Sequence, residues 1–492
     1  MKSAHIDSEA GRGEVNATRS TGPRLASAWR QADAQHRWIV ANLCLVAFAA
    51  AVLVGTSPLQ EWVFSSPVGS GDVLNQLVFV GIFLTLVFGA QTPTLRQLLP
   101  VPLGVVLLLG YCLVSVLWAI DPLVAIRRWG LAAITVWISF RLVGDLGPGR
   151  TLRILRWSLI AMLIGNYLAV LLTPYGIHSV AFGQDPMLVG NWRGIVPHKN
   201  ITGAICALTV ILFVFDNRTF PKMVSWATIA GALIFLYFTN SRTSEIVLAA
   251  SLAAGWIIRL YSPNYRAAAA VFLFLCAILG LQLLATYTDR LEELLTDPAQ
   301  LTGRTMIWPL LLEYIGEHPM TGAGFGSFWH IGEASPIWRL TSGWVARLAP
   351  HGHNGYLDLA VTIGIPGMLL AIVALLLWPF VRLLLSLDID KPRRSLLLAL
   401  LTFGAGHNLS ESSLMNGASL VHVFLLFAVA IIYFDSRSSP GLHHRLRAHL
   451  LHLLPSRDGA VDRSTARAQR RGRGAGRRTG SATDLPPGAS SD

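Results

Sequence analysis

The stretches GRTMIWPLLLEYIGEHPMTGAGFGSF, residues 303–328, and HGHNGYLDL, residues 351–359, lie in a polar segment between two long apolar runs of the chain. This segment, residues 289–356, contains an unusual share of basic and imidazole side chains: Arg304, Arg339, Arg347, His351 and His353. Guanidinium and imidazole groups are the side chains that most readily hold carboxylates and phosphates. The segment therefore predicts a binding site for an anionic group.

The composition on either side of this segment is that of a membrane protein. Of 492 residues, 53% are hydrophobic and only 13% are charged, against about 25% charged in soluble domains. Because about 20 apolar residues cross a bilayer as a helix, the pattern predicts about twelve spans, at residues 38–54, 73–90, 99–120, 129–146, 157–173, 201–215, 224–238, 245–260, 267–286, 357–384, 395–409 and 420–434. No run alternates as the strands of a membrane barrel do. We therefore expect an all-α polytopic membrane protein.

The two ends of the chain differ in composition from this apolar part. Residues 1–37 are polar and lack a cleavable secretory pattern, so we expect a disordered cytoplasmic tail there. Residues 38–434 form the expected transmembrane domain, with residues 287–356 as its large external loop. Residues 435–492 contain many arginines among Gly, Ser, Ala and Pro, a composition that cannot bury a core. We expect a disordered, basic cytoplasmic tail.

The distribution of basic residues predicts the orientation. With twelve spans and both termini in the cytoplasm, most Lys and Arg residues fall on the inner side, as the positive-inside rule requires. Several basic residues nevertheless remain on outward connections: Arg127, Arg128, Arg193, Lys199, Arg242, Arg290, Arg304, Arg339 and Arg347. Topology does not require positive charge there. We therefore predict a shared cationic pocket at the outer surface.

Three shorter outward segments supply most of these cations. They are LWAIDPLVAIRRW at 117–129, NWRGIVPHKNITG at 191–203 and FTNSRTSE at 238–245. The planar fork of arginine binds phosphate oxygens in pairs and stays charged at any relevant pH, so a pyrophosphate suits this lining. An alternative for two of the arginines is structural: Arg242 pairs with Glu245, and Arg127 pairs with Asp121.

Two groups of polar residues can carry proton chemistry or bind a substrate. His353, followed by Asn354, can exchange a proton near neutral pH, although the alternative is a loop histidine bonded to a backbone carbonyl. His351 and His353 form an HxH pair, but the sequence places no carboxylate or cysteine cluster beside it, so we predict no metal site. A polar group in the eleventh span is expected to face the bundle interior, where it either contacts substrate or bridges helices: His407, Asn408 and Glu411. The glycines of GAGFG are expected to serve a turn, since no strand precedes them as in a nucleotide loop.

Four of these motifs resemble a known family. GRTMIWPLLLEYIGEHPMTGAGFGSF followed by HNGYLDLAVTIGIPGMLL is similar to the core of the O-antigen ligase and polymerase (Wzy/WaaL-like) superfamily. RGIVPHKNITG and NSRTS resemble its ExoQ-like exopolysaccharide polymerases. The resemblance extends from about residue 118 to residue 412 and leaves out both tails.

The resemblance implies a glycosyltransferase of GT-C architecture in the bacterial inner membrane, with its active site on the periplasmic or extracellular side. The implied donor is a glycan on undecaprenyl diphosphate, and the acceptor is another lipid-linked glycan in a polymerase or a different lipid or sugar in a ligase. The donor is already activated, so neither nucleotide, metal nor other cofactor is expected. No nucleic-acid partner is expected, whereas other polysaccharide-assembly proteins are possible partners.

The same resemblance assigns roles to residues. It implies that Arg242 and Arg304 hold the diphosphate and that His353 is the catalytic histidine. The remaining substrate-binding candidates are Arg193, Lys199, His198, Asn354, Arg127, Arg128 and Glu411. We expect a polymerase, with a ligase as the alternative and a polysaccharide transporter or flippase as the alternative of another class.

Overall fold

A computed structural model describes residues 21–55, 73–89, 99–179, 188–262, 304–341 and 351–436, with single positions at 265, 278, 282, 345 and 349. All of these residues belong to one unit of the chain, residues 1–436. Within them the secondary structure is helical, apart from one isolated antiparallel bridge between Ile177 and Trp192. The expectation of an all-helical membrane protein is confirmed to this extent.

Five described helices are long and apolar enough to cross a membrane. They cover Gln35–Leu53, Pro122–Leu172, Lys222–Thr239, Arg242–Leu260 and Gly355–Leu385, and shorter apolar helices cover Val73–Gly89, Leu103–Trp118, Lys199–Val214 and Leu420–Asp435. The count of twelve spans stays a prediction, and the expected span at 267–286 lies outside the described residues. Large apolar side chains such as Leu117, Leu123 and Met223 are at least 80% exposed, as expected of surfaces that face lipid.

The first half of the chain forms α1 (Thr21–Leu53), α2 (Val73–Leu84), α4 (Leu103–Val114) and α5 (Pro122–Leu172). Helix α1 begins before residue 38, so residues 21–37, expected in a disordered tail, continue the first helix. The predicted spans 129–146 and 157–173 are both part of α5, which breaks between them where Gly147 has a φ of 73° and Pro148 follows. Proline and a left-handed glycine both interrupt helical hydrogen bonding.

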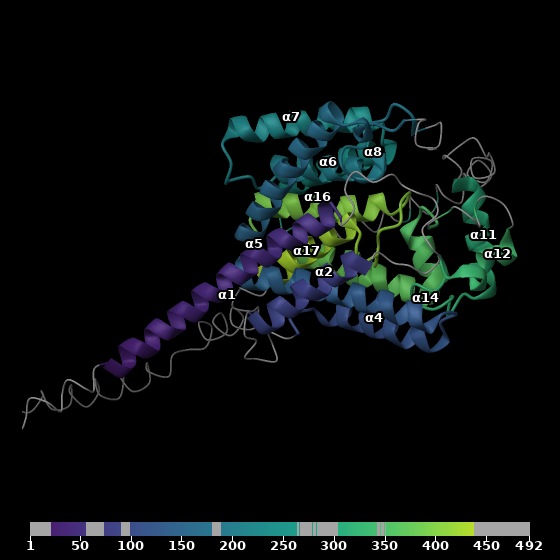
Figure 1. Ribbon diagram of the computed structural model, residues 1–492, viewed down its shortest axis with the longest axis horizontal. Helices are drawn as coiled ribbons and strands as arrows, with labels where there is room; N and C mark the ends of the chain where they lie inside the picture. Colours follow the sequence, from purple (N-terminus) through teal and green to yellow (C-terminus); the bar gives the residue numbers. More distant parts are fainter. Residues whose placement is uncertain are drawn as a thin grey trace, which may run out of the picture. The chain divides into compact units, whose positions relative to one another are not determined.

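The other helices of the bundle are α6 (Lys199–Val214), α7 (Lys222–Thr239), α8 (Arg242–Ile257), α16 (Lys391–His407) and α17 (Leu420–Asp435). Helix α6 packs against α7 and α8, and α16 packs against α8 and α17 (Figure 1). Helix α17 also packs on α5, and its residues Leu420 to Ile432 are buried almost without interruption. A helix that is apolar on all sides takes the centre of a bundle, so α17 is its core element.

The described part of the large loop forms a smaller helical layer. Helix α11 (Arg304–Glu317) and the short α12 (Ile337–Leu340) pack beside α14 (Gly355–Ile372), as Figure 1 shows in green. The turn 322–326 joins this layer to the bundle: Gly324 has a φ of +88°, and a Cβ there would meet the Cα of Ala119 at 2.4 Å. The glycines of GAGFG thus serve a tight turn, as expected.

Candidate active site

The centre of the site is Glu411, in the loop between α16 and α17. Asn408 stabilises the conformation of this loop, because its Oδ1 accepts hydrogen bonds from the backbone nitrogens of Ser413 and Leu414, each at 2.9 Å. The Glu411 nitrogen donates to the carbonyl of His407 at 3.0 Å. The loop therefore turns back at the end of α16 and leaves the Glu411 carboxylate only 11% exposed.

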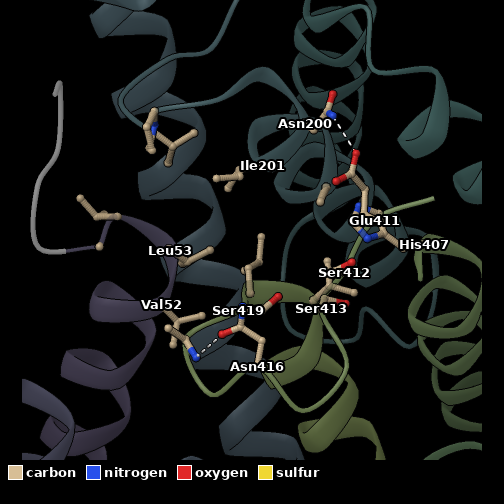
Figure 2. Close-up of a pocket in the computed structure, with 18 of the residues that line it drawn as sticks. Val52, Leu53, Asn200, Ile201, His407, Glu411, Ser412, Ser413, Asn416 and Ser419 are labelled. Atoms are coloured by element: carbon tan, nitrogen blue, oxygen red, sulfur yellow. Dashed lines mark hydrogen bonds between the residues drawn. The ribbon is translucent and has the colours of Figure 1, made fainter. Parts of the chain in front are cut away.

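Three side chains from distant parts of the chain meet at this carboxylate. Nη2 of Arg304, the first residue of α11, donates to Oε1 of Glu411 at 2.8 Å, and Nδ2 of Asn200, in the first turn of α6, donates to the same oxygen at 2.8 Å. Nδ1 of His353 lies 3.3 Å from Oε2. Figure 2 shows the Asn200 contact. The motifs GRTMIW, HKN and HNG thus share one anionic partner.

These partners keep Glu411 ionised. Burial alone raises the pKa of its carboxyl, but the hydrogen bond and charge of His353 and the charge of Arg304 outweigh burial and hold the pKa well below its usual value. An ionised carboxylate only accepts hydrogen bonds. In the contact between Oε2 of Glu411 and Nδ1 of His353, the histidine nitrogen is therefore the donor.

The turn that presents His353 is fixed on both sides. His353 has a φ of +50°, a left-handed conformation that is uncommon for a residue with a side chain and is often found at functional sites. On one side, Oδ1 of Asn354 caps α14 by accepting from the nitrogens of Tyr356 and Leu357 at 3.0 and 3.1 Å. On the other, the half-buried Asp358 carboxylate accepts from the Gly352 nitrogen at 3.0 Å and from Trp329 Nε1 at 2.8 Å.

Arg242 and Lys199 are each adjacent in sequence to a residue of this part of the structure. Lys199 precedes Asn200, and Arg242 precedes Thr243. The hydroxyl oxygen of Thr243 lies 2.8 Å from that of Ser410, the residue before Glu411, so the two side chains are hydrogen-bonded. The Arg242 side chain is 78% exposed and pairs with Glu245 at 3.2 Å, the structural alternative that the sequence suggested. Lys199 Nζ donates to the Asn240 carbonyl at 3.0 Å. Two cations therefore flank the Glu411 cluster where a ligand can reach them.

Arg193 and His198 fix the loop that precedes α6. Arg193 is 1% exposed and donates through Nε to the Tyr175 carbonyl at 2.5 Å. His198 is the N-cap residue of α6, and its Nδ1 accepts from the Asn200 nitrogen at 3.2 Å. His198 thereby positions Asn200, whereas Arg193 holds the start of the loop against Tyr175.

Arg128 belongs to a different wall. It donates through Nη1 to the carbonyls of Gly326 and Trp329, the second at 2.8 Å, and so holds the 322–326 turn against α5. Two of the cavities in the described part of the chain lie near these residues. Arg127 and Arg128 both line one of them, called the second cavity here, which has a volume of about 350 Å³ and is also lined by Asp358 and His351. The structure thus separates these two arginines from the direct partners of Glu411.

The other cavity, called the first cavity here, also has a volume of about 350 Å³ and adjoins Glu411 (Figure 2). Its polar lining includes Asn200, His407, Glu411, Ser413 and Asn416, and its apolar lining comes from the ends of α1, α6 and α17. Ligand pockets in proteins have volumes of about 300–1,000 Å³. The cavity is thus large enough for a small ligand, or for part of a larger one, beside Glu411.

A cation could in principle be held by His351, His353 and Glu411, whose ligand atoms lie within 4.8 Å of one another. The sequence placed no carboxylate beside the HxH pair, whereas the structure places Glu411 there. The Arg304 guanidinium, however, already neutralises this carboxylate, and a second positive charge beside it would be repelled. The donor set therefore suits a charge-neutral hydrogen-bonded cluster better than a metal.

Sequence reasoning missed three parts of this arrangement. Asn200 was one residue of a basic loop, His351 was one imidazole of the anion-binding segment and half of a rejected metal pair, and Asp358 was not singled out. Their only sequence signal is proximity to a basic or imidazole residue, which many surface residues share. Arg290 and Arg347, expected in the cationic pocket, lie outside the described residues.

Comparison with protein families is consistent with this geometry. No curated protein matches the chain. Residues 227–372, less than a third of the chain, match the family model described as O-antigen ligase. The match includes Arg242, Arg304 and His353 but does not reach the loop 193–203, on which the resemblance to ExoQ-like proteins depends in part. It supports an integral membrane enzyme that acts on lipid-linked glycans, either as a ligase or as a polymerase. Residues 227–372 are thus similar to the O-antigen ligase family, which supports the resemblance to the O-antigen ligase and polymerase superfamily.

Proposed function

We propose that this protein is a GT-C-type glycosyltransferase that polymerises glycan repeat units from an undecaprenyl diphosphate donor. The observation that carries the proposal is the convergence of Arg304, His353 and Asn200 on Glu411, with the exposed Arg242 and the partly buried Lys199 nearby. A diphosphate leaving group needs cations, and an acceptor hydroxyl needs a base. The cluster offers both groups within one site.

In this proposal His353 is the general base. Its Nε2 takes the proton of an acceptor hydroxyl while Nδ1–H remains bonded to Glu411, which stabilises the positive charge that forms on the ring. The hydroxyl oxygen attacks the anomeric carbon of the donor, and the bond from this carbon to the diphosphate oxygen breaks. Attack opposite the leaving group inverts the anomeric configuration. Glu411 thus acts through His353 rather than on the sugar.

The departing diphosphate requires positive charge that is already in place. Arg242 and Lys199 supply it at the exposed edge, and Arg304 contributes from the buried side, where its Nε has no hydrogen-bond partner among the described residues. Arg193, His198 and Asn354 support this site through the loop and helix ends that they fix. Arg127 and Arg128 bind glycan or phosphate groups in the second cavity.

The proposed orientation places the site on the periplasmic or extracellular side of the inner membrane, with both termini in the cytoplasm. At the far end of α16 from His407, Arg393 pairs with Asp216 at 2.5 Å and with Asp435 at 3.2 Å. This second network ties the opposite ends of α6, α16 and α17 together. Because the positive-inside rule counts Lys391, Arg393 and Arg394 toward the cytoplasm, the Glu411 cluster lies at the outward end.

The test is an in vitro reaction with purified protein and undecaprenyl diphosphate oligosaccharide as donor and acceptor. The product should grow by whole repeat units, as measured by mass. His353→Ala should lower kcat by about 10²–10⁴-fold, the usual contribution of a general base. Arg304→Lys keeps the charge but loses the fork, so turnover should fall by about 10²-fold or more. Addition of a chelator should leave the rate unchanged, because no step in this proposal uses a metal.

Two results would contradict the proposal. Normal turnover by His353→Ala would show that His353 is not the general base. A complete absence of glycan transfer by the wild-type protein would show that the proposed function is wrong. The second candidate, a ligase, is favoured by the description of the matching family. It predicts a single transfer of glycan to a different lipid or sugar instead of repeated elongation.

A further inference from the structure

The cavity beside Glu411 has two chemically different sides. Val52, Leu53 and Ile201 belong to an apolar wall from α1 and α6, whereas Glu411 and His407 lie at the polar side (Figure 2). A ligand that fits both sides must carry hydrogen-bonding groups on one face and carbon-bound hydrogens on another. Sugar rings have this character, since their hydroxyls project at the rim and their C–H groups form apolar faces.

The polar side contains hydrogen-bonding groups that the protein itself does not satisfy. His407 is 6% exposed, and neither of its ring nitrogens has a hydrogen-bond partner in the described part of the chain. The Oγ of Ser413, in a residue that is 3% exposed, likewise has no such partner among those residues. Buried polar groups are nearly always hydrogen-bonded, and leaving one unpaired costs about 1–3 kcal/mol. Groups of this kind in a cavity wall indicate a polar ligand.

The charge of the lining identifies the kind of polar ligand. Among the described residues that line this cavity there is no arginine or lysine, and Glu411 is the only acidic side chain. The cations of the site lie elsewhere: Arg242 and Lys199 at the exposed edge, and Arg128 in the second cavity. A phosphate placed in the first cavity would face Glu411 without a cation of its own. A neutral hydroxyl-bearing group meets no such penalty.

We propose that this cavity is the binding site for the acceptor, and that it recognises a neutral sugar ring through His407, Ser413 and Asn200. The ring's reactive hydroxyl then lies next to the pair formed by Glu411 and His353, while the diphosphate of the donor stays at the cationic edge. This inference rests on the proposed glycosyltransferase function. It adds that acceptor and donor are held by different residues, and that the acceptor needs no phosphate for binding.

The experiment uses an acceptor that cannot serve as a donor. The repeat-unit oligosaccharide is released from its diphosphate and coupled to a fluorescent octyl alcohol, and the full-length protein in lipid nanodiscs is supplied with unlabelled diphosphate-linked donor. Wild-type protein should transfer glycan to this neutral glycoside. His407→Gln should raise the KM for the glycoside about three- to tenfold, the loss expected for about one hydrogen bond. The KM for the donor should change less than twofold.

His422→Gln is the matched control. His422 is also fully buried without a described partner for its ring nitrogens, but it lies in α17 and does not line the cavity. It should leave the KM for the glycoside unchanged. Ser413→Ala, which removes one hydroxyl with almost no change in volume, should act like His407→Gln and thus guards against a folding defect in that variant.

Three results would overturn the inference while leaving the proposed function intact. The wild-type protein could elongate the diphosphate-linked repeat but fail to use the neutral glycoside. His407→Gln and Ser413→Ala could both leave the KM for the glycoside unchanged. They could also raise the KM of donor and acceptor equally, which would place both substrates in the same cavity. Failure of the wild-type protein to elongate any glycan would instead contradict the proposed function itself.

Discussion

At the scale of single residues, one carboxylate organises the site. Glu411 accepts hydrogen bonds from Arg304 and Asn200 at 2.8 Å each and holds His353 at 3.3 Å. Burying an isolated carboxylate would be costly, and paired groups with hydrogen bonds offset this cost. The same contacts orient the ring of His353, which we propose as the base. A structural interaction and a proposed chemical role are thus combined in the same four side chains.

Glu411→Gln tests this role directly. The variant keeps the size of the side chain and one carbonyl oxygen but removes the charge that stabilises the protonated ring of His353. We expect kcat to fall by about 10²-fold or more, with a smaller change in the KM for the donor. Measurement of kcat and of the KM for the donor tests this expectation, and thermal unfolding checks that the variant is folded. An unchanged kcat in a folded variant would show that Glu411 only stabilises the loop.

At the scale of elements, the site depends on how closely α14 approaches the loop after α16. The nitrogen of Gly355, the first residue of α14, lies 2.9 Å from the Asn408 carbonyl and 3.1 Å from the Glu411 carbonyl. A Cβ at position 355 would lie 2.1 Å from Asn408 Oδ1. The glycine in the HNG motif is therefore required by space rather than by an unusual backbone conformation.

Gly355→Ala should separate the two elements. Because Asn408 also folds the loop that carries Glu411, the displaced side chain should move Glu411 away from His353. We expect a loss of stability of about 1–3 kcal/mol, typical of overpacking, and a loss of most activity. Thermal unfolding and elongation assays measure both effects.

Gly130→Ala is the control for this experiment. Gly130 lies within α5, and a Cβ there would meet no atom within 4 Å. Replacement of a helical glycine by alanine should leave stability unchanged or raise it by up to about 1 kcal/mol. Equal behaviour of the two variants would contradict the close approach of α14 and Asn408.

At the scale of the whole molecule, two partly buried imidazoles make stability depend on pH. Burial lowers the pKa of His351 to about 3, with a further decrease from the charge of His353, and burial lowers the pKa of His198 to about 4. In the unfolded chain these rings have a pKa of about 6.5. Below that pH the unfolded chain therefore binds protons that the folded protein does not, and each lowered pKa reduces stability as the pH falls.

The prediction is a decrease in the thermal unfolding temperature between pH 7.5 and pH 5 in lipid nanodiscs. Glu411 contributes in the same direction only at lower pH, because a carboxylate with a depressed pKa stabilises the folded state above its ordinary value of about 4.3 and loses this effect below it. His351→Asn should reduce the slope between pH 7.5 and pH 5. A wild-type unfolding temperature that rises on acidification would contradict the burial of these neutral rings.

The sequence by itself determined the class of the protein, an all-helical membrane protein, and it predicted most residues of the candidate site. Long apolar runs dictate membrane helices because backbone groups must be satisfied locally in lipid, and this requirement acts within each segment. Basic residues on outward connections, such as Arg242 and Arg304, stood out because topology did not require them. Helix boundaries were less well determined: the break at Gly147 joins two expected spans in α5, and α1 begins before its apolar part.

Only the tertiary structure decided which of these residues meet. Asn200, Arg304, His353 and Glu411 lie on separate elements, more than 45 residues apart along the chain at every step. Their contact depends on the packing of α6, α11 and α14 around the loop after α16. Hydropathy carries no information about that packing. For the same reason the sequence could not distinguish Arg193, buried against backbone carbonyls, from Arg242, exposed at the edge of the site.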